Sequence, residues 1–180
     1  MKKQIRICFL GKMRSGKSEA INYLKTKYNV EVVDFGDSLK QVVNTIYPQH
    51  ANYGCKNRAL LQKVGQHMRK MDQDVWLYSV DEKINNSDKE IIACASCRQQ
   101  NEYNYLNKIA FLFVKVDCKD SLRVKRAEDA GDAFKLKDFV HETELLVDDF
   151  EYDYYIDNNG DINNFYRQID CIMKDIMKGE

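Results

Sequence analysis

The stretch IRICFLGKMRSGKS, residues 5–18, decides the fold of this chain. Its second half fits the pattern G-x-x-x-x-G-K-[ST], with Gly11, Gly16, Lys17 and Ser18 at the fixed positions. In such a phosphate-binding loop, backbone N–H groups surround nucleotide phosphates, the lysine reaches the β and γ oxygens, and the hydroxyl ligates Mg²⁺. Four fixed positions match by chance in a chain this long on the order of one time in a hundred.

The residues around the loop have the order that a phosphate-binding loop requires. An apolar run typical of a buried strand precedes it, and apolar residues at helical spacing follow it: Ile5, Ile7, Phe9 and Leu10, then Ala20, Ile21 and Leu24. We expect Gly11 and Gly16 to have positive φ angles and to allow a close approach to an anion. The following helix adds its positive end. The predicted ATP-binding residues are Gly11, Lys12, Met13, Arg14, Ser15, Gly16, Lys17, Ser18 and Glu19, with Lys17 on an exposed loop and Ser18 as the metal ligand.

Length and composition predict one compact domain, residues 1–180, because 180 residues with 44% hydrophobic content can bury a substantial core. Lysine plus arginine balance aspartate plus glutamate at 28 each, which argues against a nucleic-acid binder that relies on a basic face. The sequence has no apolar run near 18 residues and no recognisable leader. We therefore expect a cytoplasmic protein without a membrane partner, either a monomer or a homodimer.

Six cysteines are scattered along the chain, at positions 8, 55, 94, 97, 118 and 171. Several lie in or beside apolar runs, which predicts buried thiols. Cys94 and Cys97 form a single C-x-x-C at the end of a predicted strand. Without a second pair at zinc spacing, this motif does not indicate a metal site.

Strands and helices are predicted to alternate along the whole chain. The predicted strands after the first are 30–35, 90–96, 110–117 and 152–157, and the predicted helices are 38–46, 57–71, 73–84, 119–147 with a break at 130–132, and one capped by Asp161. This alternation predicts an α/β fold in three layers, with a five-stranded parallel sheet and ligands at the carboxyl ends of the strands. Polar residues that follow strands are further site candidates: Asp34, Asp37, Ser96, Arg98 and Asp117.

Other classes of nucleotide-binding protein lack support in the sequence. The N-K-x-D motif expected of a GTPase is absent. The triplet Asp34-Phe35-Gly36 matches a protein-kinase motif, but the chain is too short for that fold and has no H-R-D. Arginines are more informative, because several guanidinium groups can neutralise the charge that gathers during phosphoryl transfer. Arg58 and Arg69 precede the third strand, and Arg123 and Arg126 follow the fourth.

Five segments in order resemble the phage-type deoxynucleoside monophosphate kinases, within the wider P-loop nucleoside monophosphate kinase group. They are DFGDSLKQVV at 34–43, RALLQKVGQHMRKMDQDVW at 58–76, SCRQQNE at 96–102, HETE at 141–144 and YDYYIDNNGDI at 152–162. The resemblance implies ATP and Mg²⁺ as cofactors, nucleotide substrates, a helical acceptor-binding insert around 37–85 and a lid around 120–145. It also implies closure that excludes water from the reaction.

The same resemblance assigns roles by matching position. Asp37, Lys40, Arg58, Arg69, Arg98 and Glu102 are the implied acceptor-binding residues, and Lys17, Arg123 and Arg126 are the implied catalytic residues. The chain departs from the family in D-x-R-x-x-N-E, where Ser96 replaces the aspartate that orients the water shell of Mg²⁺. His67 also stands where the family usually has a small residue.

Three functions remain open on the sequence. The first is phosphoryl transfer from ATP to a nucleoside or deoxynucleoside monophosphate. The second is a P-loop kinase for another small acceptor, such as phosphomevalonate or dephospho-coenzyme A. The third is a nucleotide-binding protein without catalysis, for which Ser96 is the main argument.

Overall fold

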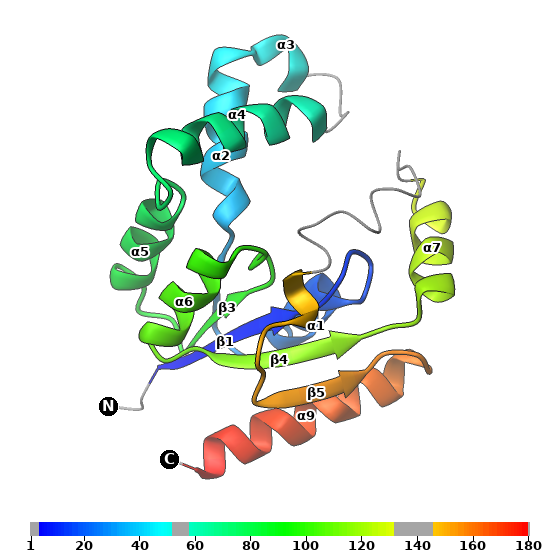
Figure 1. The fold of residues 1–180 in the computed structure, drawn as a ribbon. Coiled ribbons are helices and arrows are strands. Elements are labelled where there is room, and N and C mark those ends of the chain that lie inside the picture. Colours follow the sequence, from blue (N-terminus) through cyan, green and yellow to red (C-terminus); the bar gives the residue numbers. More distant parts are fainter. Residues whose placement is uncertain (1–3, 52–57, 132–145, 180) are drawn as a thin grey trace. The chain divides into compact units, whose positions relative to one another are not determined.

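The computed structural model describes residues 4–51, 58–131 and 146–179, and Figure 1 shows its ribbon. The strands are β1 (Ile5–Leu10), β2 (Val30–Val33), β3 (Ile91–Cys94), β4 (Leu112–Asp117) and β5 (Tyr154–Asp157). The helices are α1 (Lys17–Lys25), α2 (Phe35–Ile46), α3 (Pro48–Ala51), α4 (Arg58–Met71), α5 (Leu77–Asn85), α6 (Gln100–Lys108), α7 (Asp120–Asp129), the short 3₁₀ helix η2 (Leu146–Asp148) and α9 (Ile162–Lys178).

The strands form one parallel sheet in the order β2-β3-β1-β4-β5. Strand β1 pairs with β3 and β4, with Ile5 beside Ile91 and Leu10 beside Lys115. Strand β4 also pairs with β5. The five-stranded parallel α/β sheet predicted from the sequence is therefore confirmed.

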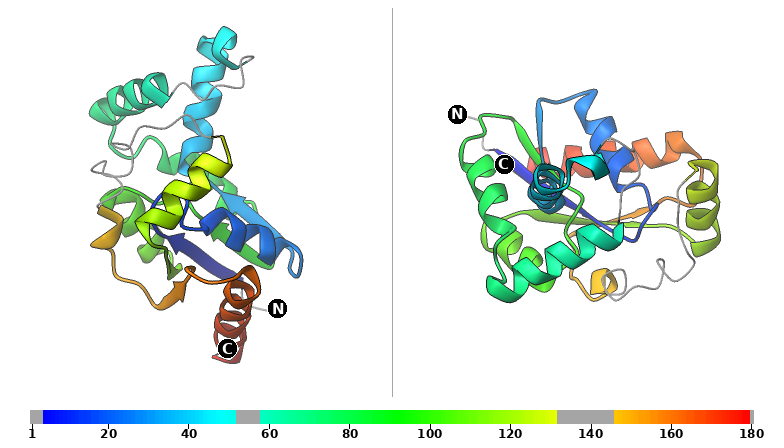
Figure 2. Two further views of the ribbon diagram at one scale, coloured as in Figure 1. Left: turned by 90° about the vertical axis from the view of Figure 1, so that its right-hand side faces the viewer. Right: turned by 90° about the horizontal axis from the view of Figure 1, so that it is seen from above.

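Helices cover both faces of the sheet, which buries its strands on two sides (Figures 1 and 2). On one face, Leu24 of α1 and Phe165 and Ile169 of α9 join a core cluster with inward-facing strand residues. On the other face, Tyr103 of α6 contacts Phe113 of β4, with ring centroids 4.5 Å apart. This packing holds the carboxyl ends of β1 and β4 in place.

The chain divides into two compact units. The first comprises residues 1–32 and 88–180 and contains most of the sheet, and the second comprises residues 33–87. Within the second unit, α2 packs against α3, α4 and α5. Its range includes the segment 37–85 for which the family resemblance implies an acceptor-binding insert.

Several boundaries differ from the predictions for local reasons. The second strand ends at Val33 rather than at residue 35, because the Asp34 side chain accepts a hydrogen bond from Gly36 N and so starts α2 three residues early. Pro48, predicted to stop a helix, also begins the short helix α3. Of the predicted helix at 119–147, α7 ends at Asp129, and residues 132–145, with HETE at 141–144, lie outside the described part.

Helix α6 was missed by the sequence analysis. Its sequence, QNEYNYLNK, has few apolar residues, so helical periodicity is weak. A capping box identifies its start, because the side chains of Gln99 and Glu102 satisfy each other's backbone N–H groups.

Asp161 caps α9 as predicted, accepting from the backbone N–H of Asn163 and Asn164.

Four of the cysteines, Cys8, Cys94, Cys97 and Cys118, are buried free thiols as predicted, whereas Cys171 is exposed. Burial raises the pKa of the Cys8 thiol well above its ordinary value, and contacts with Cys94 and Cys97 add to the shift. In the part of the chain that the structure describes, no three His, Cys, Asp or Glu side chains form a metal-binding group.

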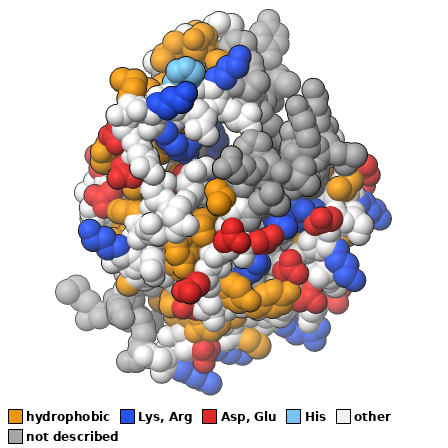
Figure 3. All heavy atoms as spheres, viewed as in Figure 1, with side chains coloured by type: hydrophobic (Ala, Val, Ile, Leu, Met, Phe, Trp, Pro, Cys, Tyr) orange, Lys and Arg blue, Asp and Glu red, His pale blue; other side chains and the backbone are white. Residues whose placement is uncertain are grey.

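Two surface properties are visible in the described residues. On the face drawn in Figure 3, acidic and basic side chains lie interspersed, in keeping with 28 residues of each sign. None of the described helices combines the length and the apolar composition needed to cross a membrane.

Candidate functional site

The loop between β1 and α1 has the backbone conformation predicted for it. Gly11 has a φ of 147° and Gly16 a φ of 115°, both in the region that favours glycine. Arg14 also has a positive φ, 63°, which the sequence did not indicate. These three residues turn the chain from the end of a central strand into the first turn of a helix.

The two glycines are required by close contacts of the loop with neighbouring chain segments. A Cβ at Gly11 would lie 2.5 Å from the carbonyl oxygen of Val116 in β4. A Cβ at Gly16 would collide with Nδ2 of Asn158, which follows β5. The prediction of positive φ is confirmed. The sequence analysis expected an anion to approach these glycines, and the structure shows that protein atoms also approach them closely.

Lys17 is buried, with 9% of its surface exposed, so the prediction of an exposed position is wrong. Its ammonium group folds back over the loop and donates to the carbonyl oxygens of Gly11, at 2.6 Å, and Lys12, at 2.8 Å. The reason is the position of Lys17 as first residue of α1, directly after the left-handed Gly16. The charge therefore lies at the centre of the loop.

The next two residues on α1 have different surroundings. Ser18 is exposed, so its hydroxyl is accessible as an oxygen ligand for a hard cation. Glu19, predicted among the ATP-binding residues, accepts a 2.5 Å hydrogen bond from the Tyr166 hydroxyl of α9, which raises the pKa of Tyr166. Glu19 thus ties α1 to α9. In phosphate-binding loops the hydroxyl at this position ligates Mg²⁺ beside the substrate phosphates, so the exposed Ser18 hydroxyl suits this ion.

Both arginines predicted to be catalytic lie on α7 and contact the backbone of the loop. Arg123 is 1% exposed and donates to the carbonyl oxygen of Met13, at 3.1 Å, and to the carboxylate of Asp120, at 2.7 Å. The hydrogen bond and charge of Arg123 lower the pKa of Asp120 below its ordinary value. The guanidinium is thereby held at the loop by its own helix.

Arg126 contacts the backbone of the loop at two further residues. It donates to the carbonyl oxygens of Arg14 and Ser15, each at 3.4 Å, and to that of Asn158, at 3.1 Å. It also lies 3.4 Å from the sulfur of Cys118. In the structure, Arg126 joins the loop to the segment after β5. The contact of Arg126 with the transferred phosphoryl group stays a prediction.

Sequence reasoning missed Asn158, which is 5% exposed and central to these contacts. Its side-chain amide donates to the carbonyl oxygen of Ser15 at 2.7 Å. The segment NNGD after the last strand was quoted only as part of a resemblance, although a polar residue at a parallel-strand end was a usable signal.

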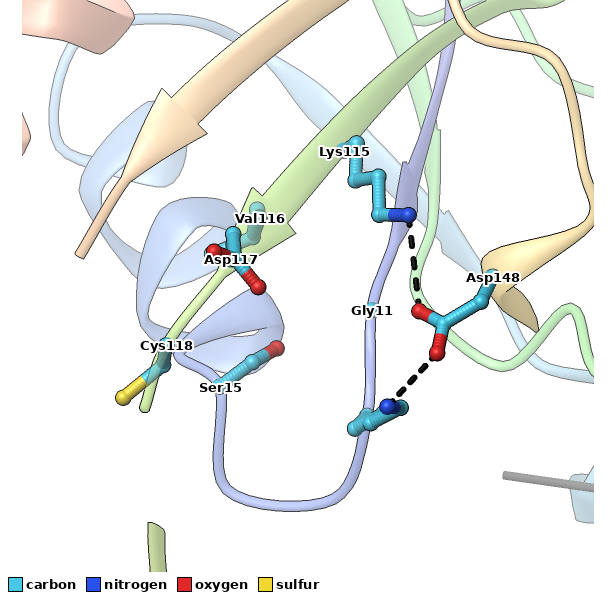
Figure 4. Close-up of a pocket in the computed structure, with 8 residues that line it drawn as sticks. Gly11, Ser15, Lys115, Val116, Asp117, Cys118 and Asp148 are labelled. Carbon is cyan, nitrogen blue, oxygen red and sulfur yellow. Dashed lines mark ion pairs between the residues drawn. The ribbon is translucent and has the colours of Figure 1, made fainter. Parts of the chain in front are cut away.

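A small pocket lies between the loop, the carboxyl end of β4 and η2, and Figure 4 shows its lining side chains. In it the Asp148 carboxylate of η2 pairs with two ammonium groups, Lys12 at 2.6 Å and Lys115 at 3.4 Å. The buried Ser15 hydroxyl, which also lines the pocket, has no hydrogen-bond partner among the described residues. Lys115 and Asp148 were not predicted, although a lysine within the apolar strand AFLFVKVD was a signal.

The acceptor-binding residues predicted within unit 33–87 lie on α2 and α4. Lys40 donates to Asp37, at 2.9 Å, and to Asp34, at 3.1 Å. Partial burial acts to lower the pKa of Lys40, but these two carboxylates outweigh it and raise the pKa. Arg69 lies half-buried on α4, and the side chain of Arg58, at the start of α4, lies outside what the structure describes.

The remaining acceptor-binding predictions concern the loop after β3. Glu102 is 3% exposed, and its carboxylate accepts from the backbone N–H of Arg98, at 2.8 Å, and Gln99, at 3.1 Å. Glu102 thus fixes the backbone that carries Arg98. Ser96 is half-buried, with its hydroxyl 3.7 Å from the sulfur of Cys94. Asp117, another strand-end candidate, accepts from Tyr155, and burial followed by this bond raises the pKa of Tyr155 to about 12.

Comparison with known proteins gives no match to a family model and none to a curated protein. Solved structures do match over nearly the whole chain. TT1252 from Thermus thermophilus is 14% identical with a TM-score of 0.63, covering 97% of this chain and 98% of that one. A shikimate kinase from Acinetobacter baumannii, solved with shikimate, is also 14% identical with a TM-score of 0.63, covering 99% and 96%.

A gluconokinase from Sinorhizobium meliloti 1021 is 14% identical with a TM-score of 0.56, and the match covers 99% of both chains. At this identity the likeness establishes the fold. The chain therefore has the α/β fold of P-loop kinases, with its glycine-rich loop in the position and conformation that the sequence predicts.

Proposed function

We propose that this chain is a kinase that transfers the γ-phosphoryl group of ATP to a small acceptor. The observation that carries the proposal is the loop 11–18 itself, with Gly11 and Gly16 at positive φ, the Lys17 ammonium at its centre and Arg123 bonded to its backbone. Backbone N–H groups and fixed cations of this kind neutralise the charge of a transferring phosphoryl group.

In this proposal each residue of the loop has a defined task. Lys17 releases its two carbonyl partners and binds the β- and γ-phosphate oxygens, which is possible because both partners belong to the loop. Ser18 would hold Mg²⁺, which would supply positive charge against the phosphate oxygens. An acceptor oxygen attacks the γ-phosphorus in line, the bond to the β-phosphate oxygen breaks, and ADP leaves.

The acceptor that we propose is a nucleoside or deoxynucleoside monophosphate. Support comes from the resemblance of five segments to phage-type deoxynucleoside monophosphate kinases and from the basic residues of unit 33–87. Arg69 is half-buried on a helix, which restricts its side chain and suits a phosphate-binding role. A phosphate acceptor is dianionic near neutral pH, so it benefits from such a cation.

A second candidate acceptor is a hydroxyl group on a small polar acid. It is favoured by the fold neighbours, which include a shikimate kinase and a gluconokinase. The reaction at the γ-phosphorus is the same, but a hydroxyl acceptor must lose a proton during attack, so a general base is needed in addition.

The test is a coupled assay of ADP release over one panel of acceptors. The panel contains the four deoxynucleoside monophosphates, the four ribonucleoside monophosphates, shikimate, gluconate, phosphomevalonate and dephospho-coenzyme A. Turnover on a monophosphate well above ATP hydrolysis alone supports the first acceptor class. Turnover confined to shikimate or gluconate supports the second, and ATP binding without turnover on any acceptor supports a non-catalytic role.

A further inference from the structure

Three charged side chains beside the loop form a cluster to which the proposed reaction assigns no task. Lys12 belongs to the loop, Lys115 to β4, and Asp148 to η2, and the single carboxylate contacts both ammonium groups (Figure 4). Lys115 is beside Leu10 in the sheet, so it lies next to the residue that precedes the loop. Two positive charges therefore share one negative charge at the edge of the predicted phosphate site.

The surroundings fix Asp148 in this place. Its neighbour Val147 is 1% exposed, and Phe150 is 4% exposed and stacks on Tyr103 with ring centroids 4.7 Å apart. The Lys115 side chain is 17% exposed, and a lysine so far removed from water on a central strand needs a counterion. Asp148 supplies it, and the same carboxylate reaches Lys12.

Of the two ammonium groups, that of Lys12 makes the shorter contact with Asp148 but belongs to the more exposed side chain. It is joined to Asp148 at 2.6 Å, but it belongs to a loop whose function is to bind anions, and its side chain is 26% exposed. Arg123 has the larger effect in lowering the pKa of Asp120, and the charge of Lys12 adds to it. The Lys12 ammonium therefore also interacts with a second carboxylate at the site. A nucleotide polyphosphate is a stronger anion than one carboxylate.

We propose that Asp148 is an exchangeable counterion that sets the affinity of the loop for nucleotide. The polyphosphate competes with Asp148 for Lys12, and Lys115 retains the carboxylate once Lys12 has moved to the phosphate. Asp148 thereby weakens nucleotide binding and favours release. This inference rests on the proposed ATP-binding function of the loop.

The size of the expected change in ATP affinity follows from the partial exposure of the Lys12–Asp148 ion pair. Partly exposed ion pairs stabilise a protein only modestly, so removing the competing carboxylate should tighten ATP binding by about two- to fivefold. The gain depends on Lys12, because without its ammonium group there is nothing for Asp148 and the phosphate to compete for. A general repulsion between Asp148 and ATP would persist without Lys12.

The experiment is a double-mutant cycle read by calorimetric titration with ATP and Mg²⁺. The dissociation constant is measured for the wild type, Asp148→Asn, Lys12→Met and the double variant. Asp149→Asn is the matched control, since it removes the same charge from the neighbouring residue. Asp148→Glu keeps the charge. Thermal unfolding of each variant shows that it is folded.

We expect Asp148→Asn to lower the dissociation constant by about two- to fivefold, Asp148→Glu to lower it less than Asp148→Asn does, and Asp149→Asn to leave it near the wild-type value. In the Lys12→Met background, Asp148→Asn should change nothing. Binding that is unaltered or weaker in Asp148→Asn, or an equal gain with and without Lys12, overturns the inference while the loop still binds ATP. If the folded wild type does not bind ATP, the proposed function fails together with the inference.

Discussion

The side-chain amide of Asn158 donates a 2.7 Å hydrogen bond to the carbonyl oxygen of Ser15, joining the end of β5 to the middle of the phosphate-binding loop across 143 positions of sequence. Arg126 binds the carbonyl oxygens of both residues. Because Asn158 is buried, water cannot replace this bond. The conformation of the loop therefore depends on the segment after the last strand.

Asn158→Ala should destabilise the protein and weaken ATP binding. Removal of the amide takes one hydrogen bond from the Ser15 carbonyl, which still accepts from Arg126, and costs about 0.5–1.5 kcal/mol in the free energy of unfolding. Chemical denaturation and ATP titration are the measurements. Asn163→Ala, at an exposed position of α9, is the control and should change both only slightly. Wild-type stability in Asn158→Ala would show that the loop does not rely on this bond.

Two glycines with positive φ give a matched test of the loop's steric restriction. Gly16→Ala places a Cβ against Asn158 Nδ2, whereas a Cβ at Gly131, with a φ of 64°, would have no described residue within 4 Å. Gly131→Ala should lower the free energy of unfolding by about 1–2 kcal/mol, which is the cost of holding alanine in the left-handed conformation. Gly16→Ala should cost more and also reduce ATP affinity. Equal losses of unfolding free energy in the two variants would contradict the close contact.

Stability should fall in acid through the pair of Asp120 and Arg123. The folded-state pKa of Asp120 is lowered, chiefly by its hydrogen bond and charge interaction with Arg123. A lowered pKa contributes stability that is present above the ordinary pKa of the carboxyl and is lost as the pH falls through the folded-state value. Unfolding measured between about pH 6 and about pH 3 should show a smaller loss in Asp120→Asn than in the wild type. Identical pH profiles would argue against this contribution.

Arg69→Ala should mainly raise the KM for the acceptor and leave kcat nearly unchanged, if Arg69 binds the acceptor phosphate equally in ground and transition states. Lys70→Ala, an exposed change one residue along α4, is the control. The measurement is the steady-state kcat and KM of each variant with the best acceptor of the panel. A fall in kcat at constant KM would mean that Arg69 acts on the transferred phosphoryl group instead.

Much of the fold could be predicted because its signals are local. The loop 11–18 has a fixed spacing, buried strands such as IRICFL are continuous apolar runs, and the Asp161 cap is adjacent to the helix it starts. Helix α6 escaped because its apolar residues are few and its capping residue, Gln99, is not a preferred one.

The site was predicted less completely because its contacts join distant residues. The loop itself was found, but Asn158, Lys115 and Asp148 reach it only through the order of strands in the sheet. The sequence alone does not reveal the order of the strands in the sheet, so it gives no reason to place Asn158 beside Ser15. Burial also depends on tertiary packing, which is why Lys17 was expected on an exposed loop although its ammonium group lies over the loop carbonyls.

The most direct test of the central claim is γ-phosphoryl transfer by Lys17→Met, measured as ADP released with the best acceptor of the panel. Methionine keeps the bulk of the buried side chain and removes its charge, so the variant should fold. Lys25→Met, at the exposed end of the same helix, is the control and should retain wild-type turnover. The proposed mechanism predicts a loss on the order of 10³-fold or more in Lys17→Met. Wild-type turnover in a folded Lys17→Met protein would contradict the assignment of the loop as a catalytic phosphate-binding site.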